Sequence, residues 1–179
     1  MPRLRVYIAC SLDGFIAGPD GDLSWLPQPS GDEAPGQEDD FGYADFISGV
    51  GALLMGRTTY DAVRAMGIPW PYERSVVVAT HRPLDDAPAG VSAAAGDIGA
   101  LVETAARRAG GKDVYIDGGA LIRQALDAGL VDEMCVTVIP VILGAGHPLF
   151  AGVARRQTLS LVAQRALPGG LVQLTYRLP

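Results

Sequence analysis

Hydrophobic residues recur along the chain in two alternating patterns. Short runs of aliphatic and β-branched residues, typical of buried strands, lie at 4–10, 50–55, 74–80 and 114–117. Between and after them, apolar residues recur at helical spacing at 41–49, 56–67, 98–109 and 119–126. Strands that alternate with helices in this way predict a largely parallel sheet.

The last third of the chain has strand patterns only. An apolar run extends through Ile139 and is closed by Pro140. Two alternating segments, Thr158–Ala166 and Leu171–Leu178, then flank the turn sequence PGG at 168–170 and predict a hairpin. We therefore predict an α/β fold with a central, mostly parallel sheet, an antiparallel C-terminal edge and helices on both faces.

Two irregular segments follow the first strand. The loop at 11–25 is rich in Gly and Asp and has apolar anchors, among them Phe15 and Leu23. Residues 26–40 have no hydrophobic period and contain many Pro, Gly and acidic residues, which predicts a flap at about 26–38 rather than a linker. At 179 residues the chain fits one domain spanning 1–179.

Polar residues before three helical patterns are candidate helix caps. Asp39 or Asp40 precedes the first helix, Thr58 begins the second, and Asp97 precedes the third. The Asp side chain is a preferred cap because its oxygen accepts from the free N–H groups of the first turn.

The stretch Val114–Leu126, VYIDGGALIRQAL, predicts a buried strand that turns tightly into an amphipathic helix. The pair Gly118-Gly119 lies where the first free N–H groups of that helix point outward, and these favour an anion such as a phosphate. The alternative is a tight turn that binds nothing, because this run is shorter than a dinucleotide-binding fingerprint.

Three junctions, 55–59, 80–82 and 117–120, lie at the carboxyl ends of predicted strands, where parallel sheets bind ligands. If they converge, they bring together two helix N-termini and positive charge from Arg57 and Arg82. That combination suits a diphosphate with an additional phosphate. The alternative is that His81 and Arg82 are solvated loop residues.

Composition excludes several classes of protein. The net charge is −6 and no cluster of Lys and Arg occurs, which argues against nucleic-acid binding. No apolar run of 18 residues and no signal-peptide pattern is present, so we expect no membrane span. Cys10 and Cys135 lie far apart in apolar runs and predict free, buried thiols in a reducing cytoplasm, with no metal site.

Five motifs in this order resemble the dihydrofolate reductase superfamily: VYIACSLDGFIAG, LLMGRTTYD, VVVATHRP, VYIDGGALIRQAL and VDEMCVTVIPVILGAGHPLF. They are most similar to the C-terminal reductase domain of the bifunctional riboflavin-biosynthesis deaminase-reductase. The resemblance implies NADPH-dependent hydride transfer to a pteridine- or pyrimidine-type heterocycle. The implied cofactor positions are Ala9, Ile16, Gly56, Arg57, Thr58, Thr59, Thr80, His81, Arg82, Gly118, Gly119, Ala120, Leu121 and Ile122.

The resemblance also implies substrate-side residues. Asp40 occupies the region of the family's proton donor, and Trp25 resembles its substrate-side tryptophan, although either residue also fits a structural role as a helix cap or a core aromatic. His147 in a glycine-rich turn is a further candidate for substrate contact. The loop 11–25 resembles the family's mobile lid, and the strand at 134–143 resembles its homodimer contact. The alternative function is an NADP-binding protein with little or no catalysis.

Overall fold

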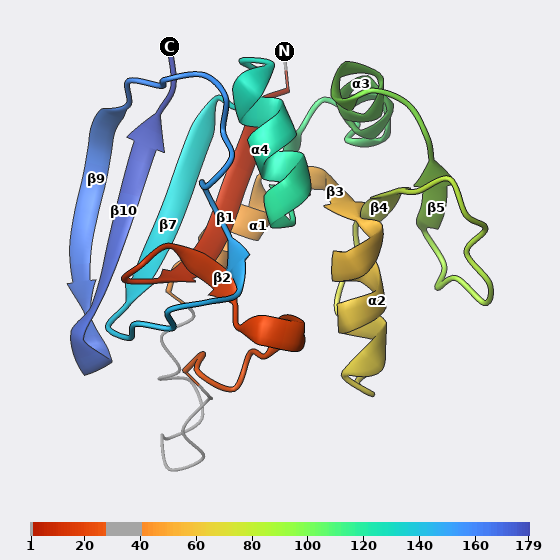
Figure 1. Ribbon diagram of the computed structural model, residues 1–179. Helices are drawn as coiled ribbons and strands as arrows, with labels where there is room; N and C mark the ends of the chain where they lie inside the picture. The colour runs from red at the N-terminus through yellow and green to blue at the C-terminus, as the bar shows by residue number, and fades with distance from the viewer. Residues whose placement is uncertain (1, 28–40) are drawn as a thin grey trace.

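The structure is a computed structural model that describes residues 2–27 and 41–179 (Figure 1). Within these residues the main sheet has eight strands, and β10 and β9 extend it from β7 by antiparallel pairing, while all other neighbours pair in parallel. The predicted sheet is therefore confirmed. Its strands, in spatial order, are β5 (Val91–Ala94), β4 (Ser75–Ala79), β3 (Val50–Gly56), β6 (Asp113–Asp117), β1 (Leu4–Ser11), β7 (Glu133–Ile139), β10 (Leu171–Arg177) and β9 (Ser160–Leu167).

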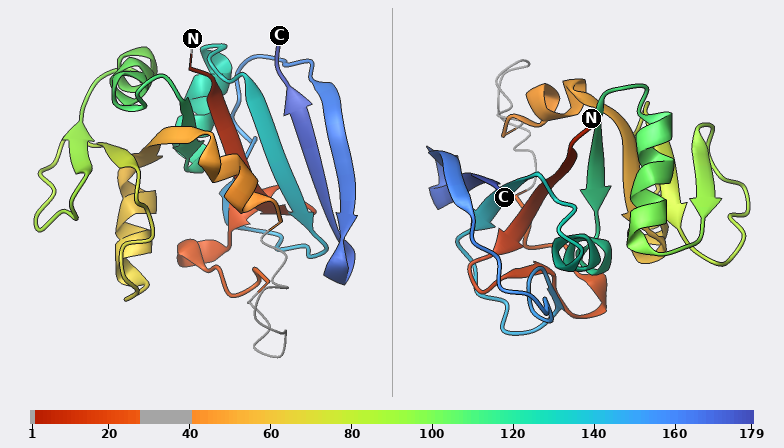
Figure 2. Two further views of the ribbon diagram at one scale, coloured as in Figure 1. Left: turned by 180° about the vertical axis from the view of Figure 1, so that it is seen from behind. Right: turned by 90° about the horizontal axis from the view of Figure 1, so that it is seen from above.

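Helices cover both faces of the sheet (Figure 2). Helices α3 (Ile98–Arg108) and α4 (Gly119–Asp127) pack on one face, and α1 (Tyr43–Ser48) and α2 (Arg57–Ala65) pack on the other. Because successive side chains of a strand point to opposite faces, β4 contributes Val77 to the first core and Val76 and Val78 to the second. All three valines are fully buried.

The helix starts differ in part from the predictions. Asp97 caps α3 as predicted, since its Oδ1 accepts from the Ala100 N–H at 2.9 Å. The prediction for α2 is wrong: Gly56 is the N-cap, with an extended backbone, and Thr58 lies inside the first turn. No side chain caps α2, so the first N–H groups of this helix are left for another partner.

Short elements without a periodic signal were not predicted. They are β5 and a second, two-stranded sheet formed by β2 (Phe15–Ala17) and β8 (His147–Pro148). The second sheet brings the loop after β1 against the glycine-rich turn after β7. A Cβ at Gly146 would lie 2.1 Å from the Ala17 carbonyl oxygen, so only glycine permits this approach. No helix in the described part of the chain is long and apolar enough to cross a membrane.

Candidate functional site

Two helix N-termini meet at the carboxyl edge of the sheet. Strands β3 and β6 are neighbours, and the helices that follow them, α2 and α4, begin side by side. Gly118 adopts a left-handed φ of +96°, and a Cβ there would lie 2.6 Å from Thr59 Oγ1 and 3.8 Å from the Gly56 nitrogen. The junction therefore requires glycine both for its backbone angle and for space.

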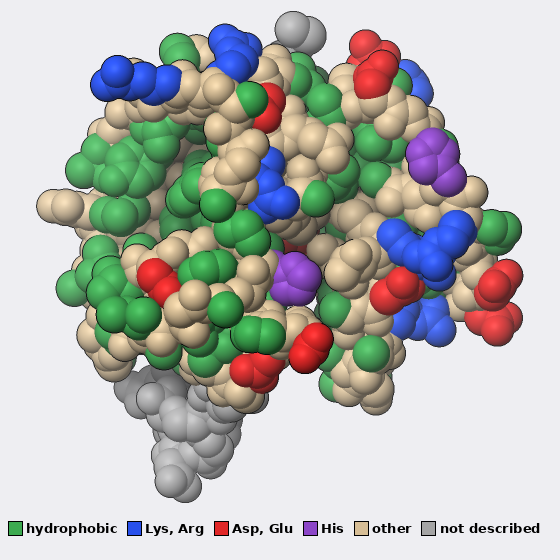
Figure 3. Space-filling view, viewed as in Figure 1, with side chains coloured by type: hydrophobic (Ala, Val, Ile, Leu, Met, Phe, Trp, Pro, Cys, Tyr) green, Lys and Arg blue, Asp and Glu red, His purple; other side chains and the backbone are tan. Residues whose placement is uncertain are grey.

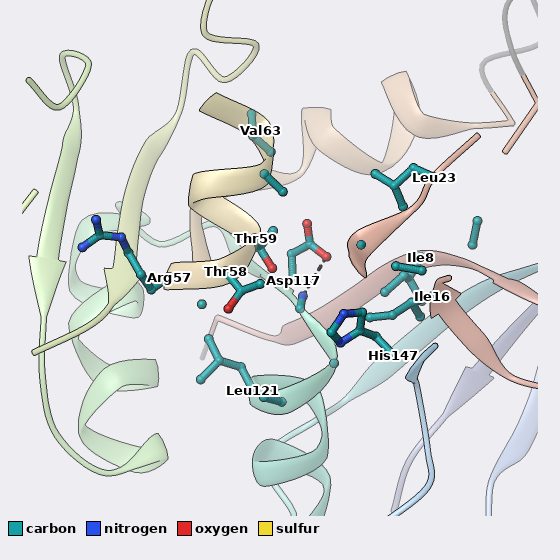
Figure 4. A pocket seen from close by; sticks show the side chains of 18 of the residues that line it. Ile8, Ile16, Leu23, Arg57, Thr58, Thr59, Val63, Asp117, Leu121 and His147 are labelled. Atoms are coloured by element: carbon teal, nitrogen blue, oxygen red, sulfur yellow. Dashed lines mark hydrogen bonds between the residues drawn. The ribbon is translucent and has the colours of Figure 1, made fainter. Parts of the chain in front are cut away.

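A cavity of about 720 Å³ opens beside this junction (Figure 4). Its walls come from β1, β2, β3, β4, β6 and β8 and from helices α1, α2 and α4. Ten of the predicted cofactor positions line it: Ala9, Ile16, Gly56, Arg57, Thr58, Thr59, Gly118, Gly119, Ala120 and Leu121. Two of the three predicted junctions, 55–59 and 117–120, thus meet at one cavity, whereas the junction 80–82 does not line it.

Four predicted cofactor positions do not line the cavity. Ile122 is fully buried in the core between α4 and the sheet, which corrects the expectation for this residue. Thr80, His81 and Arg82 form a loop beyond β4, in which Thr80 Oγ1 accepts from the Arg82 N–H at 3.0 Å. This loop lies next to the site, because an Arg57 guanidinium nitrogen donates to the Pro83 carbonyl at 3.1 Å.

The two substrate-side predictions have different outcomes. Asp39 and Asp40 lie outside the described residues, so the place of Asp40 stays a prediction. The N-cap residue of α1 is Gly42, with φ of +82°. Trp25 packs against a small core cluster and its Nε1 donates to the Asp22 carbonyl. Trp25 is not among the residues that line the cavity, which favours the core-aromatic alternative.

Asp117 is a site residue that sequence reasoning missed. It ends β6 and its side chain lies in the cavity, with Oδ1 accepting from the Gly118 N–H at 2.8 Å (Figure 4). Burial raises the pKa of this carboxyl group to about 6, which the Gly118 hydrogen bond only partly opposes. An acidic residue directly between a buried strand and a Gly-Gly pair was the available signal.

Tyrosines surround Asp117 from separate segments. Tyr115 lies on β6, Tyr43 on α1, and Tyr72 on the segment after α2, and all three line the cavity. Burial raises the pKa of each phenol, and the nearby Asp117 charge raises it further. Tyr7 completes the group, since the Tyr115 hydroxyl donates to the Tyr7 carbonyl at 2.9 Å.

The opposite wall is formed by the start of α4 and the two-stranded sheet. A Cβ at Gly119 would lie 3.0 Å from both Ile16 Cδ1 and the Pro148 carbonyl oxygen. Arg123, one turn later on α4, donates to that same Pro148 carbonyl. His147 also lines the cavity, next to Ile16 in Figure 4, which is consistent with its choice as a candidate contact residue.

Asp13 joins the two loops that border this wall. Its carboxylate accepts from the Ser11 hydroxyl at 2.6 Å and from the N–H groups of Leu143 and Gly144 at 3.1 and 2.7 Å. These hydrogen bonds, the Ser11 one foremost, lower the pKa of Asp13, so the group is ionised at neutral pH. The loop 11–25 is therefore tied to the turn after β7.

Metal chemistry finds no support among the described residues, where no cluster of three His, Cys, Asp or Glu side chains could hold an ion. The two cysteines are free thiols, as predicted, with Cys10 buried. The polar groups that line the cavity are hydroxyl groups, the Asp117 carboxyl group, two guanidinium groups, the His147 imidazole and backbone N–H groups.

The fold and the glycine junction define an α/β domain of the dihydrofolate reductase-like class. Within this class, the chain belongs to the family of the RibD C-terminal domain, whose model matches residues 2–173. Two relatives from Bacillus subtilis (strain 168), uncharacterized proteins YwjB and YyaP, are 36% and 30% identical to it. These alignments cover 96% and 97% of this chain and 95% and 94% of the relatives.

Solved structures share the fold. A Shewanella sp. PV-4 protein named for riboflavin biosynthesis is 30% identical, with a TM-score of 0.83 and 99% of each chain covered. A Thermotoga maritima deaminase and 5-amino-6-(5-phosphoribosylamino)uracil reductase is 18% identical, with a TM-score of 0.68 over 99% of this chain and 57% of that one. The fold of this chain is therefore that of the RibD C-terminal domain, in the branch that the motif order resembles.

Proposed function

We propose that the protein is an NADPH-dependent reductase that transfers a hydride to a pteridine- or pyrimidine-type small molecule. The observation that carries the proposal is the meeting of two helix N-termini at Gly118, beside a large cavity. Each N-terminus presents backbone N–H groups and a positive dipole end, so the pair suits a diphosphate. Membership of a reductase-like family supports the same class of reaction.

The residues present fit this cofactor. Gly118 and Gly119 leave room for a diphosphate to approach the backbone, and Thr58, Thr59 and Arg57 face it from α2. We assign the nicotinamide to the region of Ala9 and Ile16, whose apolar side chains exclude water from the reacting carbon. The cofactor supplies the hydride, and the chain supplies its position.

His81 and Arg82 are proposed to bind the adenosine 2′-phosphate. Both side chains are exposed and lie on the loop that the Arg57 hydrogen bond to Pro83 holds beside the start of α2. Two bases at this place favour NADPH over NADH, because NADH lacks the additional phosphate.

Asp117 is proposed to hold the proton that accompanies hydride transfer. Reduction of a C=N bond is assisted by a protonated group near the nitrogen, and a carboxyl group with a pKa of about 6 is partly protonated near neutral pH. Turnover should therefore decrease as the pH rises above about 6. Asp40 remains the second candidate for this role.

The test of the cofactor site compares NADPH and NADH affinities by quenching of tryptophan fluorescence. We expect NADPH to bind at least tenfold more tightly, a difference of roughly 1.4 kcal/mol. Arg82→Ala should remove most of this preference, whereas the control Arg108→Ala, at the exposed end of α3, should leave it unchanged. Failure of both nucleotides to bind would refute the proposal.

The test of catalysis follows NADPH oxidation over a panel of dihydropteridines and aminouracil derivatives. Asp117→Asn should lower turnover at least tenfold while NADPH affinity is retained, and the same assay on Asp40→Asn decides between the two acids. NADPH binding without oxidation of any panel member would favour the alternative, an NADP-binding protein with little or no catalysis.

A further inference from the structure

The charged groups of the cavity are distributed unevenly. Its basic residues, Arg57, Arg123 and His147, lie at the α2 start, on α4 and on β8. They adjoin Thr58, Gly119 and Ile16, which are positions assigned above to the cofactor. Figure 4 shows Arg57 pointing away from the side of the cavity where Leu23 and Ile8 lie. Arg57 also forms a salt bridge with Asp61, with 2.7 Å between Nε and Oδ1, and Arg123 donates a hydrogen bond to the Pro148 carbonyl.

The other half is aromatic and apolar. It comprises the tyrosines around Asp117 together with Leu23, Leu26 and the α2 side chains Val63 and Met66. Among the described residues that line this half, Asp117 carries the only ionisable acid or base other than the phenols. No basic side chain contributes to the pKa of Asp117 or to those of the three tyrosines near it.

The segment outside the described residues does not alter this balance. Residues 28–40, QPSGDEAPGQEDD, contain five acidic residues and no Lys, Arg or His. Whatever its position, this segment has no basic side chain that could pair with an anionic ligand.

On the basis of the proposed function, we propose that the ring substrate of this chain is an uncharged nitrogen heterocycle that carries no phosphate. Phosphate sites in proteins are built from Arg, Lys or helix N-termini, and here the described ones face the cofactor half. A phosphate group in the aromatic half would lose its hydration beside a carboxyl group without gaining a cation. A planar ring, by contrast, stacks against the tyrosines, and its N–H group donates a hydrogen bond to the Asp117 carboxyl group.

This substrate class differs from the one in the name of the Thermotoga maritima neighbour, whose uracil substrate bears a phosphoribosyl group. That difference supplies a matched pair of ligands: 5-amino-6-(5-phosphoribosylamino)uracil and its dephosphorylated riboside. Riboflavin and riboflavin 5′-phosphate form a second pair with a larger ring. Within each pair only the phosphate changes.

The experiment measures the affinity of each ligand for the full-length protein by calorimetry, with and without saturating NADPH. We expect the uncharged member of at least one pair to bind at least tenfold more tightly than its phosphate. Met66→Lys, at the half-exposed end of α2, should tighten binding of the phosphate at least fivefold and change the uncharged member less than twofold. The control variant Ile68→Lys, at an exposed residue that does not line this cavity, should change neither.

Equal or tighter binding of the phosphorylated members, or binding of no uncharged ligand, would overturn this inference. So would an Arg123→Gln variant that loses affinity for the phosphates alone, because Arg123 would then be their partner. NADPH affinity, measured separately, reports on the proposed function: its absence refutes the reductase assignment, while the titrations without cofactor still test the ligand class.

Discussion

Replacing Asp117 with Asn should stabilise the protein at neutral pH. The carboxyl group is buried beside three tyrosines and receives one hydrogen bond, from the Gly118 N–H, which an Asn oxygen can also accept. The substitution therefore removes the cost of burying a charge and keeps the shape and the hydrogen bond of the native side chain.

The magnitude follows from the pKa. Burial raises the pKa of Asp117 from 3.8 to about 6. A difference of one pKa unit between the folded and unfolded states corresponds to roughly 1.36 kcal/mol. The folded protein binds this proton more tightly than the unfolded chain does. The stability that the protonated Asp117 contributes is therefore fully present below the unfolded pKa, and it is lost as the pH rises through the folded pKa of about 6. At pH 7 the ionised carboxylate therefore costs about 3 kcal/mol.

Urea denaturation of the wild type and Asp117→Asn, at intervals from pH 4 to pH 8, measures this effect. The free energies of unfolding should be similar near pH 4, and the variant should become more stable as the pH increases, by about 3 kcal/mol at pH 7. The control Asp85→Asn, in the exposed loop before β5, should follow the wild type. A difference between wild type and Asp117→Asn that does not change with pH would refute the reasoning.

Three further perturbations test other features. Gly118→Ala should abolish NADPH binding and destabilise the fold more than Gly111→Ala does. Both glycines have a left-handed φ, but only at Gly118 would an added Cβ contact Thr59. Equal denaturation midpoints for the two variants would contradict this. Asp13→Ala should increase amide hydrogen exchange at Leu143 and Gly144, and unchanged exchange would show that its carboxylate does not hold the turn. Apolar side chains gather over β9 and β10 (Figure 3), and Val172 on β10 is an exposed hydrophobic residue, so we expect a homodimer that Val172→Glu converts to a monomer in sedimentation. An unchanged mass would exclude Val172 from the contact.

The glycine junctions could be predicted because their chemistry is local. A strand pattern, a glycine and a helix pattern in succession specify where free N–H groups point, whatever the rest of the chain does. Asp117 was missed because its raised pKa depends on burial in the folded chain, where it shares a cavity with Tyr43 and Tyr72, residues on other elements. No local pattern around Asp117 indicates which side chains cover it.

The errors within predicted elements have similar physical causes. Ile122 was grouped with its neighbours from Gly118 onward, but a helix turns by about 100° per residue, and this turn points Ile122 into the core. Thr58 was expected to cap α2, yet Gly56 takes the extended N-cap conformation one position before the helix begins. The homodimer contact expected at 134–143 stays a prediction; β7 lies inside the sheet between β1 and β10, and β9 forms that end of the sheet.

The position of β1 has a consequence for synthesis of the chain. Strand β1, the earliest strand of this sequence, lies between β6 and β7, so Leu4 pairs with Val114 and Arg5 with Glu133. Both edges of β1 therefore stay unpaired until β6 has been synthesised, and a truncated chain that ends before Glu133 leaves the edge facing β7 uncovered. Folding to the native sheet must await these distant partners, which exposes the apolar strand β1 to incorrect pairing during synthesis.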